Sequence, residues 1–161
     1  LVLSDLLHFG GNRIDESIIT YVKRTYNLVI GQKTAQALKE KLGSGIPGNT
    51  ETMVIVGRDV VSGLPIEMEI TGEAVYEAIK DNLNSICNSI KLAKDIIHSV
   101  IYITGGSSQI HNLSQLFKDI TGIEINTCEE PEECVVRGLV KIVSDQKYKH
   151  LAFSMKNKIL K

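Results

Sequence analysis

The sequence has little cysteine, no long apolar run and almost no net charge, and each shortage removes a class of protein. Its three cysteines, Cys87, Cys128 and Cys134, lack close CxxC spacing, which favours free thiols in a reducing cytoplasm over a disulfide scaffold. No stretch approaches the roughly 20 unbroken apolar residues that cross a bilayer. The formal net charge of −1 argues against a general nucleic-acid binder, which carries a strong basic excess.

No catalytic or metal-binding constellation is recognisable either. The four histidines are dispersed, without metal-ligand spacing: His8, His98, His111 and His150. Cys128 and Cys134 could approach each other, but two thiols without nearby histidines make a poor metal site. Asp15 and Glu16 could act as general bases, although the simpler interpretation is acids in a first helical turn. We therefore predict no catalytic residue and no metal ligand.

Hydrophobic periodicity predicts a mixed α/β fold. Apolar residues at helical spacing predict helices after a cap at Asn12, over 33–42, after a cap at Thr71, after Ser108 and from Pro131. Strands are predicted over 1–9, 53–56, 66–70, 100–103 and 123–126. The second and third of these strands form a hairpin, and the run 100–103 has the composition of a strand covered on both faces. The last helix is expected to pack through Val135, Val136, Leu139, Val140 and Val143.

The end of the chain, residues 146–161, is a basic tail with five lysines and no acid. Leu151, Met155, Ile159 and Leu160 recur there at roughly helical spacing. Such a segment could lie on an anionic membrane. A solvated or frayed terminal helix is the simpler interpretation.

The junction Thr104-Gly105-Gly106-Ser107-Ser108 follows a predicted strand and precedes a predicted helix. Two glycines allow a ligand to approach the backbone, and the amides of a helix start favour negative or polar groups. Ligands also bind at the carboxyl ends of strands in α/β sheets. The junction is thus a candidate nucleotide site, and the alternative is a tight turn with a serine helix cap.

A second candidate is the helix segment that carries Gln36, Lys39 and Glu40. Helical spacing places these three side chains on neighbouring surface positions. A cation and polar acceptors at those positions could hold a ribose and the edge of an adenine. The alternative is a solvated, charged helix face.

An ordered set of motifs from about residue 8 to 143 resembles the MreB family of bacterial actin-like proteins. The matching segments are residues 10–19 with Tyr21-Val22, residues 26–31, Thr34-Ala35 with Lys39, Gly57-Arg58-Asp59, Ser62-Gly63-Leu64-Pro65, Thr104-Gly105-Gly106, and Glu129-Glu130-Pro131 with Cys134-Val135 and Gly138. Two positions depart from the family pattern, which usually has Glu at position 36 and Gly at position 107. Here they are Gln36 and Ser107.

The resemblance implies the second lobe of an actin-like, ribonuclease H-like ATPase: a mixed sheet with helices and a small inserted α+β subdomain. The larger subdomain would comprise 1–11 and 72–145, the smaller 12–71 with its hairpin, and the tail 146–161. In the full-length parent, ATP with Mg²⁺ would lie between two lobes. By the same resemblance, one group of residues contacts adenosine or the base and ribose: Gln36, Lys39, Glu40, Gly105, Gly106, Ser107 and Ser108.

The implied function is a cytoskeletal subunit that binds ATP and polymerises into filaments that maintain rod cell shape. Its expected partners are other copies of itself and the membrane-associated cell-wall synthesis machinery, with no nucleic acid. Its expected location is the cytoplasm, at the inner face of the cell membrane, with membrane contact indirect or through the first lobe. Because the phosphate loops and the magnesium-positioning residues would precede residue 1, we expect no appreciable ATPase activity from this chain alone.

Two other classes remain open at this point. One is a chaperone-like or sugar-kinase-like ATPase lobe of the same superfamily, and the other is a stand-alone binding module. The hairpin over 57–65 favours the MreB family over the kinases.

Overall fold

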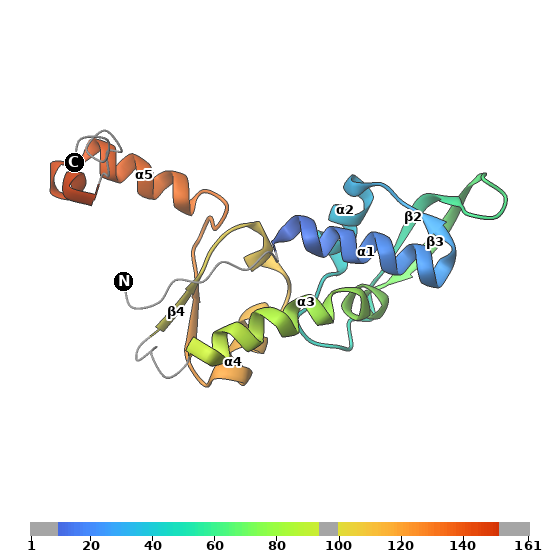
Figure 1. Ribbon diagram of the computed structural model, residues 1–161, viewed down its shortest axis with the longest axis horizontal. Coiled ribbons are helices and arrows are strands. Elements are labelled where there is room, and N and C mark those ends of the chain that lie inside the picture. Colours follow the sequence, from blue (N-terminus) through green and yellow to red (C-terminus); the bar gives the residue numbers. More distant parts are fainter. Residues whose placement is uncertain (1–9, 94–99, 152–161) are drawn as a thin grey trace, which may run out of the picture.

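A computed structural model describes residues 10–93 and 100–151 of the chain (Figure 1). The helices are α1 (Gly11–Tyr26), α2 (Gln32–Leu42), α3 (Gly72–Ala93), α4 (Leu113–Thr121) and α5 (Cys134–Ser144), with 3-10 helices at Gly106–Gln109 and Gln146–Leu151. The strands are β1 (Leu28–Val29), β2 (Thr52–Asp59), β3 (Pro65–Thr71), β4 (Val100–Ile103) and β5 (Glu124–Thr127). The predicted strand over 1–9 and the tail beyond residue 151 lie outside the described residues.

Local chemistry sets several of the helix boundaries. Asn27 ends α1 with φ 52°, and Gly122 ends α4 with φ 71°, both in the left-handed region that Gly and Asn tolerate. The Thr71 hydroxyl oxygen accepts the Ala74 amide at 3.2 Å, which confirms the predicted cap of α3. The predicted cap at Asn12 is wrong, because α1 already begins at Gly11 and no side chain caps it.

The first sheet is antiparallel, with the strand order β1-β2-β3. The β2–β3 hairpin confirms the prediction and pairs Met53 with Ile70 and Val56 with Glu67. The two-residue strand β1 was not predicted, since two residues carry no periodic signal. It packs closely because Gly57 of β2 has no side chain: a Cβ there would meet Leu28 Cγ at 2.5 Å.

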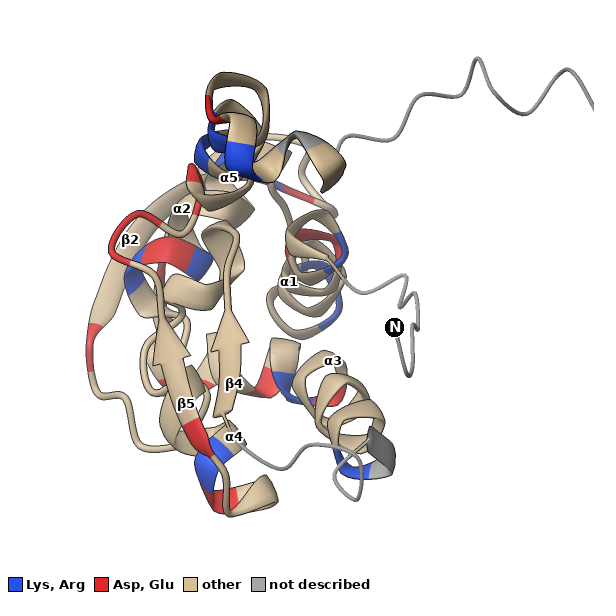
Figure 2. Ribbon diagram, turned by 90° about the vertical axis from the view of Figure 1, so that its left-hand side faces the viewer, with Lys and Arg blue, Asp and Glu red and all other residues tan. Residues whose placement is uncertain are grey.

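The second sheet consists of β4 and β5, which run parallel with Ile101 opposite Ile125 (Figure 2). The expectation that 100–103 is covered on both faces is wrong for the described residues, since Tyr102 is 71% exposed. The physical reason is that β5 is the one strand paired with β4 in the described part of the chain. An apolar run therefore predicted the strand but not its neighbours.

The core lies where α1 packs against α2 and α3, as Figure 1 shows. Its fully buried side chains recur along these helices every three or four residues, as predicted. They include Ile14, Ile18, Leu38, Leu42 and Ile79. This packing fixes α1 and α2 relative to each other, and so places Lys39 of α2 beside Asp15 of α1.

Helix α5 differs from its prediction in two respects. It begins at Cys134, so Pro131 precedes the helix instead of forming its first turn. The Pro131 carbonyl accepts hydrogen bonds from the Thr104 hydroxyl and the Gly105 amide. The second difference is exposure: the side chains expected to pack are between 57% and 75% exposed, namely Val135, Val136, Leu139, Val140 and Val143. Among the described elements, α5 makes its main contacts with the 3-10 helix that follows it, at the end of the molecule opposite the hairpin (Figure 1).

Candidate functional site

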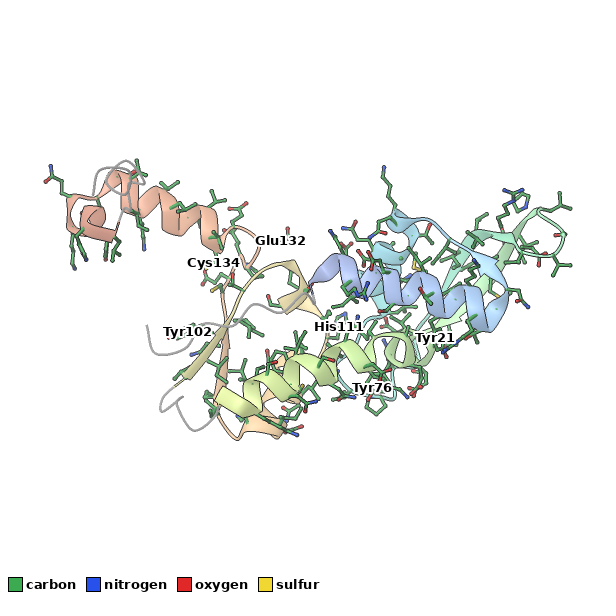
Figure 3. The ribbon with its side chains drawn as sticks, in the orientation of Figure 1. Tyr21, Tyr76, Tyr102, His111, Glu132 and Cys134 are labelled. Carbon is green, nitrogen blue, oxygen red and sulfur yellow. The ribbon has the colours of Figure 1, made fainter. Side chains whose placement is uncertain are left out.

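A cleft of about 660 Å³ lies where four separate segments meet. The start of α1 contributes Gly11, and α2 contributes one polar face. The loop after β4 and the loop before α5 supply the other walls. The lining residues are Gly11, Gln36, Lys39, Glu40, Gly106, Ser107, Gln109, Ile110, His111 and Glu132. Figure 3 labels two of them, His111 and Glu132.

Lys39 is the one lysine of this cleft, and it is held in place by two partners. Its Nζ lies 2.8 Å from Asp15 Oδ1 and donates to the Gly11 carbonyl at 3.3 Å. The Lys39 side chain is only 11% exposed and that of Asp15 only 4%. A buried pair of this kind restricts the ammonium to one position at the cleft wall. The interpretation of this helix face as solvated is therefore wrong for Lys39.

The same interpretation is correct for the two neighbours of Lys39 on α2. Gln36 and Glu40 are both exposed. The Gln36 amide donates to the Glu40 carboxylate at 2.7 Å, an i,i+4 contact along the helix. Their oxygens and amide hydrogens remain accessible from the cleft.

Asp15 has a different role from the one predicted. Because α1 begins at Gly11, its first turn contains no acid, and Asp15 lies on the buried face with 3% of its surface exposed. Gln32 donates to its second oxygen at 3.2 Å. Glu16 is exposed and pairs with Arg13, as a solvated helix acid does. Asp15 is thus a positioning residue for Lys39, not a helix-dipole acid.

The glycine junction forms the opposite wall. Gly105 has φ +89°, a conformation that favours glycine, and its amide donates to the Pro131 carbonyl at 2.8 Å. The predicted helix does not follow directly: a 3-10 helix over Gly106–Gln109 intervenes, and α4 begins at Leu113. The serine-cap alternative is also wrong, because no side chain caps the 3-10 helix or α4. The Ser108 hydroxyl donates back to the Gly105 carbonyl at 2.7 Å.

Two glycines keep the cleft open. A Cβ at Gly11 would lie 3.0 Å from Ser107 Oγ and 3.4 Å from Lys39 Nζ. A Cβ at Gly106 would lie 3.1 Å from Glu132 Oε1. Any side chain at either position would therefore crowd the polar groups on the walls.

The structure thus brings together five of the seven predicted residues on the cleft wall. These are Gln36, Lys39, Glu40, Gly106 and Ser107, while Gly105 and Ser108 shape the turn behind them. Sequence reasoning missed His111, which has no motif of its own. It reaches the cleft because the backbone of the loop after α2 binds it: Gly45 donates to the His111 carbonyl at 2.7 Å.

Chemically, the cleft offers one held ammonium, two carboxylates, a hydroxyl and amide groups, which are partners for a polar heterocycle and a sugar. Within residues 10–93 and 100–151, no three His, Cys, Asp or Glu side chains gather as a metal site would require. Over the same ranges, no helix combines the length and apolar character needed to cross a membrane.

Comparison with solved structures identifies the class. The MamK double helical filament matches with a TM-score of 0.70 at 22% identity, over 85% of this chain and 45% of that one. Crystalline MreB 5 of Spiroplasma citri bound to AMPPNP matches with a TM-score of 0.82 at 32% identity, over 94% of this chain and 48% of that one. The fold is therefore that of one lobe of an actin-like protein.

The family follows from sequence. The family described as MreB/Mbl protein matches residues 1–151. The cell shape-determining protein MreB of Escherichia coli is 34% identical over 148 residues, which cover 86% of this chain and 43% of that protein. The chain belongs to the MreB/Mbl family, and it spans less than half the length of these relatives.

Proposed function

We propose that this chain is the nucleotide-facing second lobe of a bacterial actin-like cytoskeletal protein that binds ATP and polymerises into filaments maintaining rod cell shape. The observation that carries the proposal is the cleft in which Gly11, Lys39 and the Gly106-Ser107 turn converge. Family membership supports a nucleotide as the ligand of that cleft, since MreB 5 of Spiroplasma citri was crystallised with AMPPNP.

In this proposal, α2 and the glycine turn hold the adenosine from two sides. Gln36, Lys39 and Glu40 contact the ribose and the base edge, while Gly105, Gly106, Ser107 and Ser108 form the surface against the base. Mg²⁺ and the phosphates belong to the rest of the full-length protein. The subdomain limits at residues 11/12, 71/72 and 145/146 are part of the same proposal.

Self-association is the second part of the proposal. It is supported by the likeness to MamK, whose structure is a double helical filament. Further partners would be the membrane-associated cell-wall synthesis machinery, met in the cytoplasm at the inner face of the cell membrane. Membrane contact would be indirect or made by the other lobe.

The alternative of a chaperone-like or sugar-kinase-like lobe is less well supported. The curated relatives that match are cell shape-determining proteins. The residues that resemble the MreB hairpin, 57–65, lie at the end of the β2–β3 hairpin, where Gly57 pairs with Ile66 and Arg58 with Pro65.

Two adjacent glycines provide a matched test of the nucleotide site. The valine side chain of Gly11→Val would crowd Ser107 and Lys39, whereas that of Gly10→Val would meet no atom within 4 Å of its Cβ. In the full-length protein, we expect Gly11→Val to weaken ATP binding about tenfold or more, equivalent to at least about 1.4 kcal/mol. Gly10→Val should leave the affinity unchanged. Calorimetric titration with ATP measures both.

Equal affinity of the two variants would contradict the placement of adenosine in this cleft. Circular dichroism and thermal unfolding of both variants serve as the folding control. The Cβ at position 11 meets two side-chain atoms, Ser107 Oγ and Lys39 Nζ, and no backbone atom, so we expect the native fold to be retained.

A further inference from the structure

Cys128 and Cys134 are two thiols in direct contact beside the nucleotide cleft. Their sulfur atoms lie 3.4 Å apart, one just after β5 and the other at the first residue of α5. Both side chains are partly exposed, whereas Cys87 is 2% exposed within the core. A disulfide needs about 2.0 Å between sulfur atoms, so a small rotation of the side chains would close the bond.

The two thiols are also accessible to small reactants. Both line a hollow of about 700 Å³ on the surface of α5. Arg137, which lines the same hollow, pairs with Glu130 and Glu133, so it offsets the negative charge of the intervening loop. A neutral oxidant can therefore reach either sulfur atom.

The environments of the two sulfur atoms differ. Thr104, and then Cys128, lower the pKa of the Cys134 thiol. The Thr104 hydroxyl donates to the Pro131 carbonyl, and a rotation would let it donate to a Cys134 thiolate instead. The first turn of an 11-residue helix also favours a thiolate. The bond with Cys134 raises the pKa of Cys128. One sulfur atom is thus suited to attack an oxidant, and the other to resolve the product.

We propose that Cys128 and Cys134 form a reversible intramolecular disulfide, with Cys134 as the attacking thiol and a hydroperoxide as the oxidant. The Cys134 thiolate attacks the outer peroxide oxygen, which breaks the O–O bond and leaves a sulfenic acid and an alkoxide, or hydroxide from hydrogen peroxide. That leaving group takes up the proton that the Cys134 thiol had released and becomes an alcohol or water. Cys128 then attacks the sulfenic sulfur atom, forms the S–S bond and releases water. Two thiols are oxidised as one peroxide is reduced, and a dithiol reductant reverses the bond by exchange.

The disulfide would close a loop that already touches the glycine turn. The Pro131 carbonyl, inside that loop, accepts both the Thr104 hydroxyl and the Gly105 amide at 2.8 Å. Glu132, the next residue, lines the cleft against Gly106. Oxidation would thus tie the end of β5 to the start of α5 directly behind the cleft.

Hydrogen peroxide treatment of the purified protein, followed by mass spectrometry of unreduced peptides, tests the proposal. We expect the loss of two hydrogens, a bridged peptide joining residues 128 and 134, and reversal by dithiothreitol. Cys87→Ser should not change this result. Cys128→Ser should accumulate a sulfenic acid at Cys134 that dimedone traps, and Cys134→Ser should accumulate much less at Cys128. Thr104→Val should slow the reaction while preserving the bridge.

A bridge that uses Cys87, a bond between two molecules, or peroxide-treated protein with intact thiols would each overturn the proposal. Equal dimedone labelling of the two single variants would overturn the assigned roles. The readouts involve no nucleotide, so they do not depend on the function proposed above.

Discussion

At the scale of single residues, the buried ion pair of Asp15 and Lys39 joins α1 to α2 at the wall of the cleft. Both residues fall in segments that resemble the family, and Lys39 is predicted to contact the nucleotide, but the sequence pattern predicts Asp15 only as an acid of a first helical turn. The ion pair joins residues on different helices, and only the packing of α1 against α2 brings them within 2.8 Å. Local spacing carries no information about such a partner.

This pair yields a stability prediction. Asp15→Ala leaves the Lys39 ammonium buried with one carbonyl partner, which typically costs about 3–5 kcal/mol of unfolding free energy. Glu16→Ala removes an exposed partner of Arg13 and should cost about 0–1 kcal/mol. Urea denaturation of the two neighbouring variants measures the difference. Similar midpoints would show that the Asp15–Lys39 pair does not stabilise the fold.

At the scale of elements, alternating or helical patterns predicted the hairpin, α1, α2 and α3, because each buries one regular face in a common core. The glycine junction was placed correctly, but its 3-10 turn was not predicted. Four residues carry no periodicity, and the backbone of Pro131, from a distant segment, shapes the turn. The exposure of α5 was missed because an apolar stripe predicts burial without naming the surface that covers it.

The hairpin turn gives a prediction about pH. Asp59 accepts the amides of Val61 and Ser62 at 2.8 and 2.6 Å and the Ser62 hydroxyl at 2.9 Å. These bonds, with those from Ser62 dominant, lower the pKa of Asp59 from its ordinary value of 3.8. A lowered folded-state pKa stabilises the turn above the ordinary pKa, and this contribution is lost as the pH falls through the lower value.

Carboxyl-carbon NMR titration measures this pKa directly. We expect Asp59 to titrate below 3.8, and Ser62→Ala to move the midpoint upward by removing the hydroxyl donor. The backbone amides remain, so the midpoint should not return fully to the ordinary value. Titration at or above 3.8 in the unmodified protein would show that the turn does not form as described.

At the scale of the whole molecule, the ordered motifs predicted the family and the fold, and the fold explains how the candidate residues meet. The cleft could be predicted only in part, because its walls come from α1, α2, the turn after β4 and the loop before α5. Gly11 and Lys39 lay in recognised motifs, whereas His111 reached the cleft through backbone contacts with the loop after α2. Long-range contacts thus decided which residues face one another.

The central claim is that this lobe belongs to a nucleotide-dependent filament protein. Electron microscopy of the full-length protein, incubated with ATP and magnesium or without nucleotide, tests it most directly. The account predicts filaments with ATP in the unmodified protein and in Gly10→Val, and few or none in Gly11→Val, whose side chain crowds the cleft. Dispersed monomers of the unmodified protein with ATP, particularly with phosphate transfer to a small substrate, would contradict the cytoskeletal role.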